Sequence, residues 1–146
     1  MKTISPQDLN NLQLQTLLQT AIAPRPIALA STIDKEGNIN LSPFSFFNLF
    51  SSNPPVVIFS PARRVRDNTT KHTLENVLEI PEVVIGIVNY KIVQQISLAS
   101  TEYSKAENEF IKSGLTMKDA DLVQPKLIDE CPVNLECKVL EVKPLG

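Results

Sequence analysis

Aromatic side chains gather in one short polar segment of the chain. Four of the six phenylalanines fall between residues 44 and 50, interleaved with serine and asparagine. A flat heteroaromatic ligand needs this mixture, because apolar walls hold its rings while backbone N–H groups and hydroxyls bind its carbonyls and nitrogens. A loop that plugs one end of a β-barrel core would have the same composition. The segment by itself therefore leaves both interpretations open.

Residues 60–76 have the side chains and the helix start that a phosphate group needs. Ser60 and three arginines lead into the run TTKHT, residues 69–73, where a helix is expected to begin. Backbone N–H groups and the helix dipole at that end attract phosphate. Threonine hydroxyls and the Lys71 ammonium would complete the match of charge. The alternative is that Thr69 or Thr70 caps the helix and that the arginines are simply solvated.

The residue types give little support to acid–base or metal chemistry. His72 is the single histidine, and a Ser-His-Asp triad would require Ser45 or Ser60 to reach it without a G-x-S-x-G elbow. One histidine and two cysteines are too few for a zinc site. Cys137 falls on the apolar side of an expected strand, as a buried thiol would, and a Cys131–Cys137 disulfide is the less favoured alternative. We predict no catalytic acid or base and no metal site.

The composition is that of one ordinary globular domain, with 42% hydrophobic and 21% charged residues in 146. A net charge of −2 gives no basic excess that would indicate nucleic acid or an anionic membrane. Because neither a secretory signal nor an apolar run of about 20 residues is visible, we expect a cytoplasmic location. The four glycines form no G-x-G-x-x-G and no P-loop, so a nucleotide would have to be bound without either cradle.

The expected elements are mainly strands, joined by short helices. Apolar or alternating runs predict strands over residues 25–33, 56–60, 83–89 and 133–139, and a strand that starts at residue 38. Helices are predicted over residues 5–20, 71–80, 91–100 and 105–113. A turn is expected at residues 34–37 with Gly37 at positive φ, and prolines argue against a regular central strand over residues 42–55. This pattern favours a small closed barrel.

The order of these segments resembles the flavin reductase-like family of FMN-binding split barrels. The likeness rests on RPIALAST, then D-x-x-G-x-x-N-L-S-P-F-S-F-F-N, then NPPVVIFSPARR and KHTLENV, and spans about residues 20–140. It implies a mainly β fold with short helices, a small Greek-key split β-barrel. His72 stands where the family usually has an acidic residue. Family members normally continue with further strands, so we expect residues 1–146 to form a single domain without the family's C-terminal strands.

The resemblance also implies which residues hold FMN. Around the isoalloxazine ring and the ribityl chain it places Ser31, Thr32, Ser45, Phe46, Phe47 and Asn48. Around the phosphate it places Ser60, Arg64, Lys71 and Thr73, with Arg25 near the mouth of the pocket.

The implied activity is that of a flavin oxidoreductase. NADH or NADPH would give a hydride to FMN, held as a cofactor or as an exchangeable substrate, and the protein would supply positioning and electrostatics rather than a proton. The resemblance implies a homodimer with a shared site, and a partner oxygenase is a further candidate. Two alternatives stay open: an FMN-binding module without NAD(P)H turnover, and a truncated barrel that acts as an interaction domain.

Overall fold

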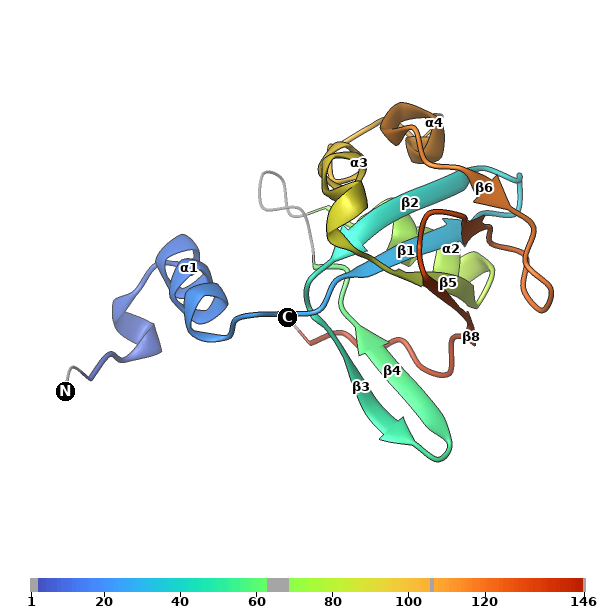
Figure 1. Ribbon diagram of the computed structural model, residues 1–146. Helices are drawn as coiled ribbons and strands as arrows, with labels where there is room; N and C mark the ends of the chain where they lie inside the picture. The colour runs from blue at the N-terminus through green and yellow to red at the C-terminus, as the bar shows by residue number, and fades with distance from the viewer. Residues whose placement is uncertain (1–2, 63–68, 106, 146) are drawn as a thin grey trace.

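The computed structural model describes residues 3–62, 69–105 and 107–145 (Figure 1). The strands are β1 (Ala28–Ile33), β2 (Ile39–Phe44), β3 (Phe47–Ser52), β4 (Pro55–Phe59), β5 (Glu82–Ile87), β6 (Met117–Lys118), β7 (Leu127–Ile128) and β8 (Val133–Lys138). The helices are η1 (Pro6–Asp8), α1 (Asn11–Ala21), α2 (His72–Glu79), η2 (Tyr90–Ile92), α3 (Val93–Ala99) and α4 (Glu109–Ser113).

Four antiparallel strands form the central sheet, in the order β2-β1-β5-β8. β1 lies inside this sheet because its run ALAST is small or β-branched and can be buried on both faces. The turn that joins β1 to β2 has Gly37 at φ 87°, as the sequence predicts. Alternation of side chains then divides the core into two layers.

One layer packs beneath α3 and α4, and the other packs against the start of a separate hairpin. Leu29 and Leu41 belong to the first layer, with Phe110 of α4. Ala28 and Phe44 belong to the second, together with side chains of β3 and β4.

Two parts of the molecule extend away from this body. β3 and β4 form a two-stranded hairpin of their own, which projects from one end of the sheet (Figure 1). Helix α1 lies to one side, joined to β1 by an extended segment, and none of its residues is buried (Figure 1).

Several sequence expectations need correction. The predicted helix over residues 5–20 is two elements, because the side chain of Asn10 and that of Gln13 form a capping box that starts α1 at Asn11. The strand over residues 56–60 is not a buried one, since it lies in the projecting hairpin. In α2 the buried face is polar, with Thr73 and Asn76 beside Val77, while the expected core residue Leu78 is 66% exposed.

The closed barrel is also wrong in the part of the chain that the structure describes. The strands form three separate sheets, and β2 and β8 are the unjoined edges of the largest. The wider prediction of a mainly β fold with short helices is confirmed. Both cysteines are free, so the disulfide alternative does not apply. Within the described ranges, no helix has the length and apolarity needed to cross a bilayer, and no group of three His, Cys, Asp or Glu residues is placed to bind a metal ion.

Gly86→Ala should destabilise the fold. A Cβ at this position of β5 would lie 2.7 Å from Cys131 Sγ and 3.0 Å from Ile128 Cδ1, inside the packed layer. Overpacking of this kind lowers the free energy of unfolding by about 1–3 kcal/mol, which urea denaturation measures.

Its control is a double-mutant cycle with Cys131→Ala, which removes the nearest atom. The glycine substitution should cost less in that background. An equal cost in both backgrounds would show that this contact does not limit the site.

Candidate functional site

Three segments that are distant in the sequence meet at Phe44, the last residue of β2. The buried Phe44 ring lies 5.5 Å from the ring of Phe59, the last residue of β4, at an interplanar angle of 40°. The Lys71 ammonium, directly before α2, lies 5.0 Å from the centre of the Phe44 ring. The face of an aromatic ring attracts such a cation. The aromatic segment and Lys71 of the phosphate segment, identified separately in the sequence, therefore adjoin in space.

The base of the hairpin is fixed beside this point by backbone pairing. The Ser60 N–H donates to the Phe46 carbonyl at 2.8 Å, and Phe47 pairs with Phe59. The Phe47 side chain packs against the second core layer. Phe46 is 44% exposed and Asn48 is exposed, so this part of the segment faces outward. Ser60 and residues 46–48 are thus neighbours, as the resemblance requires.

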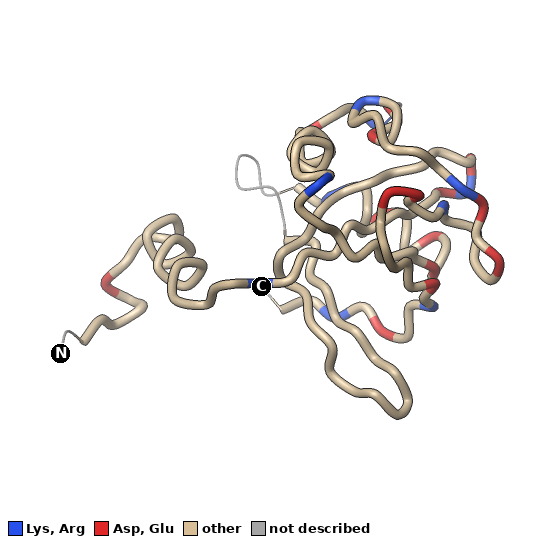
Figure 2. Tube along the Cα trace, viewed as in Figure 1, with Lys and Arg blue, Asp and Glu red and all other residues tan. Residues whose placement is uncertain are grey.

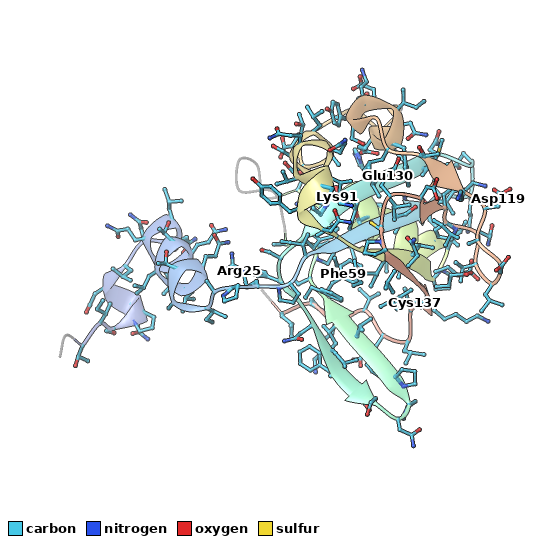
Figure 3. All side chains as sticks on the ribbon, viewed as in Figure 1. Arg25, Phe59, Lys91, Asp119, Glu130 and Cys137 are labelled. Carbon is cyan, nitrogen blue, oxygen red and sulfur yellow. The ribbon has the colours of Figure 1, made fainter. Side chains whose placement is uncertain are left out.

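Arg25 joins the arm of α1 to the same segment (Figure 3). Its guanidinium Nη1 donates to the carbonyls of Gln19 and Ile22, at 2.5 and 2.6 Å, at the end of α1. A cation there suits the helix dipole and satisfies carbonyls that have no partner within the helix. Its Nε lies 3.4 Å from Ser45 Oγ, a long hydrogen bond. Arg25 is placed next to the site segment, and its closest contacts hold the arm.

Ser31 and Thr32 are neighbours in β1, so their side chains point to opposite faces of the sheet. Thr32 Oγ1 accepts a hydrogen bond from Asn76 Nδ2 of α2 at 3.2 Å. Ser31 is fully buried on the Leu29 side, and its hydroxyl has no partner among the described residues. The two predicted ring-lining residues therefore do not share one surface.

The predicted phosphate residues are placed unequally. Lys71 is the N-cap residue of α2 and is partly buried. Thr73, in the first turn, is fully buried, and its hydroxyl lies 2.9 Å from the Asn40 amide of β2. Its side chain thus faces the sheet. Arg64 lies outside the described residues. The phosphate-binding role of all three stays a prediction.

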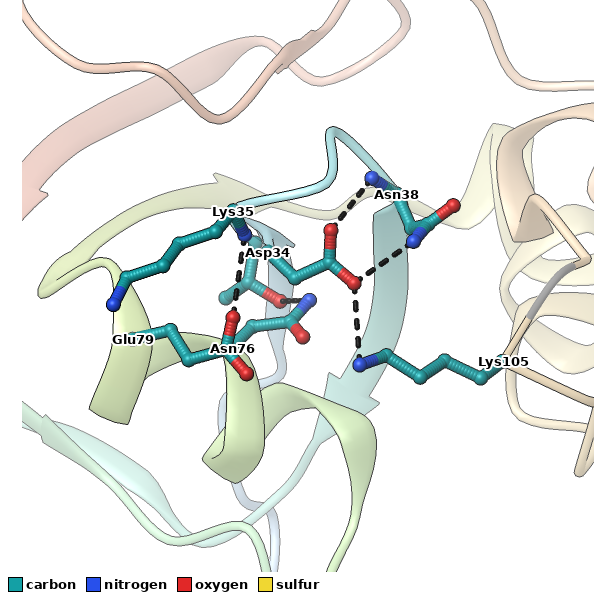
Figure 4. A network of polar contacts seen from close by, with 7 residues as sticks. Asp34, Lys35, Asn38, Asn76, Glu79 and Lys105 are labelled. Carbon is teal, nitrogen blue, oxygen red and sulfur yellow. Dashed lines mark hydrogen bonds and ion pairs between the residues drawn. The ribbon is translucent and has the colours of Figure 1, made fainter.

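Sequence reasoning missed a buried polar network at the other end of β1 and β2 (Figure 4). Asp34 accepts hydrogen bonds from Asn38 N at 2.8 Å and Asn38 Nδ2 at 2.9 Å, and pairs with the Lys105 ammonium at 3.2 Å. Burial raises the pKa of Asp34, but these donors outweigh it and lower the pKa to about 2. A side-chain-bonded turn could have been predicted from an aspartate placed before Gly37 and Asn38. The distant Lys105 could not.

Glu109 connects α4 to the free edge of β2. The carboxylate is buried, and its Oε2 accepts a hydrogen bond from the Leu41 N–H at 3.1 Å. We assign the Asn40 amide with Nδ2 toward Glu109 Oε1, at 3.2 Å, because its oxygen then accepts from the Thr73 hydroxyl instead of facing a carboxylate. Burial is the main cause that raises the pKa of Glu109. This carboxylate, through Asn40, ties α4 to the first turn of α2.

Comparison with known proteins decides the family. Residues 20–146 match the flavin reductase like domain. The chain belongs to the flavin reductase-like family. A protein of Aquifex aeolicus is 38% identical over 132 residues, which are 90% of this chain and 67% of the relative. The similarity that defines this flavin reductase-like chain thus extends over nearly its whole length.

Solved structures agree with the family. Nitrilotriacetate monooxygenase component B from Bacillus cereus superposes with a TM-score of 0.94 at 29% identity, covering 100% of this chain and 71% of that one. A protein with a split barrel domain from Shewanella frigidimarina gives a TM-score of 0.83 at 25% identity, covering 100% and 72%. The predicted split-barrel fold class is confirmed. This flavin reductase-like chain spans about two thirds of the length of these relatives.

Glu109→Gln should stabilise this flavin reductase-like chain near neutral pH. The folded-state pKa of Glu109 is raised, so its contribution to stability is present below the unfolded-state pKa and is lost as the pH rises through the folded-state pKa. Glutamine stays neutral and keeps an acceptor for Leu41 N–H. Thermal melts should show a midpoint a few degrees higher than wild type near neutral pH, with the gain shrinking towards pH ~4.

Glu107→Gln is the matched control on the same segment. Its ion pair with Lys112 lowers the pKa of Glu107, so the sign is opposite: that contribution is present above the unfolded-state pKa and is lost as the pH falls through the folded-state pKa. Equal behaviour of the two variants would show that burial of Glu109 does not govern its effect.

Proposed function

We propose that this chain binds FMN and transfers a hydride to it from NADH or NADPH. The observation that carries the proposal is the junction at Phe44, where an aromatic segment rich in hydroxyl and backbone donors meets the Lys71 cation. A flavin mononucleotide has the two matching parts, a flat ring system and a phosphate dianion. Family membership supports flavin as the ligand class.

The donor set at the junction fits the group. Phe46 is exposed next to the Ser60–Phe46 backbone contact and offers an apolar surface for a ring. Lys71 precedes an α-helix of eight residues, so an ammonium and a helix N-terminus lie together for the phosphate. Ser45, Phe47, Asn48, Thr32 and Arg25 would complete the surroundings, in contact with ring, ribityl chain or pocket mouth.

The chain's part in such a reaction is positioning. FMN, when bound, supplies a ring that accepts hydride from a nicotinamide, and this transfer needs no protein acid or base. Backbone N–H groups of residues 45–47 would stabilise negative charge that develops on the pyrimidine side of the ring. The apolar side chains beside them would exclude water from the reacting face.

We further propose that the protein works as a homodimeric single domain and passes reduced flavin to a partner oxygenase. The Bacillus cereus relative is named as a component of a monooxygenase, which supports such a partner. Stopped-flow mixing with NADH and NADPH tests turnover. Bound flavin that neither nucleotide bleaches would favour the alternative, a flavin-binding module without turnover.

FMN should bind, and FAD should bind no more tightly. The chain offers one candidate phosphate site, at residues 69–73, and no second cradle for a pyrophosphate. Isothermal titration of the purified chain with both flavins measures this, with the visible absorbance spectrum as a second readout. Clearly tighter binding of FAD would contradict the single-phosphate assignment.

Lys71→Ala should weaken FMN far more than riboflavin, because only FMN has the phosphate dianion. A lost charge-assisted contact should cost about 1.5–3 kcal/mol of binding free energy, measured by titration with both ligands.

Lys35→Ala is the matched control. Lys35 is an exposed lysine in the turn at the opposite end of β2 from Phe44. It should leave both affinities unchanged. Equal losses of FMN and riboflavin in Lys71→Ala would show that Lys71 does not contact the phosphate.

A further inference from the structure

The two parts that extend from the body share a second property: neither has a charged residue. Residues 9–24, which contain α1, and residues 37–62, which contain the β3–β4 hairpin, include no Asp, Glu, Lys or Arg. Figure 2 shows both as uncoloured tube, while charged side chains cover the rest of the body. Depletion of charge is typical of the centre of a protein–protein interface.

Both parts also expose large apolar side chains. At the tip of the hairpin Leu49 is 61% exposed and Phe50 is 65% exposed. On the arm Leu18 is 49% exposed, and Leu12 and Ile22 more so. Clustered exposure of this kind marks an interaction surface rather than ordinary scattered hydrophobic residues.

Neither element has the contacts that would stabilise it alone. Isolated helices shorter than about 12–15 residues are marginal in water, and α1 has 11 residues and buries none of them. A lone two-stranded hairpin is likewise marginal unless a further layer packs on it. An additional layer from outside the single chain would supply what both lack.

An apolar cleft lies between these elements. It has a volume of about 410 Å³ and is lined by Leu14, Leu18 and Ile22 of the arm, and by Arg25 and Phe46, with polar groups at its margin. Its apolar lining suits hydrophobic side chains better than a charged nucleotide.

We propose that this cleft holds Leu49 and Phe50 from the hairpin tip of a second copy of the chain, and that the exchange is reciprocal. In an extended strand about 3.3 Å is gained per residue, so the tip lies roughly 10–13 Å along the hairpin from Phe46. Two hairpins packed antiparallel about a two-fold axis bring the tip of each to the cleft of the other. Each copy then gives the same two surfaces, as a closed dimer requires.

The inference deepens the proposed function, on which it rests for the role of the site. Phe46 and the Arg25–Ser45 contact belong both to the cleft and to the surroundings of the proposed flavin site. The second copy therefore covers the outward face of the site segment. A single copy would leave that face open to water.

Light scattering and sedimentation of the flavin-free chain test the surface independently of flavin chemistry. Leu18→Asp places a charge in the cleft, and Phe50→Asp places one on the tip. Each should weaken self-association at least about tenfold in Kd, as loss of a central apolar contact does. Leu122→Asp, a charge on a still more exposed residue of the body, should leave association unchanged.

Mixing the two variants gives the decisive result. A Leu18→Asp copy keeps an intact tip and a Phe50→Asp copy keeps an intact cleft, so the mixture can form a heterodimer with one intact contact. The mixture should associate more tightly than either variant alone. A monomeric wild type, variants that associate like wild type, or a mixture no better than its components would each overturn the proposal.

Two further measurements keep the test sharp. Circular dichroism checks that both variants fold, and if one does not, Leu18→Gln and Phe50→Ser replace the pair. A Leu18→Cys/Phe50→Cys chain should form disulfide-linked dimers on oxidation, and its failure to cross-link would also overturn the arrangement. Absence of FMN binding by an intact dimer would refute the proposed function alone.

Discussion

The pairing of β1 on both edges is the constraint on which the rest of the molecule depends. β2 and β5 occupy its two sides, so all six of its residues lie in the interior or close to it. A strand in that position must bury whatever side chains it has. Ser31 and Thr32 are therefore buried hydroxyls, and the molecule has to supply partners for them or accept their desolvation. Thr32 obtains Asn76, and Ser31 obtains no partner among the described residues.

That requirement explains why α2 sits where it does. Its buried face is built of Thr73 and Asn76, which meet Asn40 and Thr32 on the sheet. A helix held by hydrogen bonds has a defined rotation and a defined start, whereas a greasy face could slide. The start of α2 is thus fixed, and Lys71 before it reaches Phe44 at the opposite edge of the site. Glu109 adds a further tie from α4 to the same edge strand.

Local pattern was sufficient for the elements and insufficient for what they pack against. The apolar run of β1, the turn at Gly37 and the alternation of β8 were all predictable, because each depends on neighbours in sequence. The polar face of α2 was not, since helical spacing of Leu74, Val77 and Leu78 carries no information that the surface beneath is Thr32 and Asn40. The Glu109–Leu41 contact joins residues 68 apart and leaves no local signal. In the site, resemblance located Lys71 and residues 45–48 but could not show that Ser31 and Thr32 point to opposite faces.

The packing of Cys131 against Gly86 has a chemical consequence for a protein that belongs to a flavin family. Burial, helped by the nearby Glu130 charge, raises the pKa of the Cys131 thiol to about 11, and burial raises the pKa of Cys137 as well. The thiolate is the form that peroxide oxidises, and at neutral pH both residues are held almost entirely as thiols. Reduced flavins generate peroxide when they meet oxygen. The tight interior that leaves no room for a methyl group at residue 86 thereby also makes the chain's sulfur resistant to oxidation.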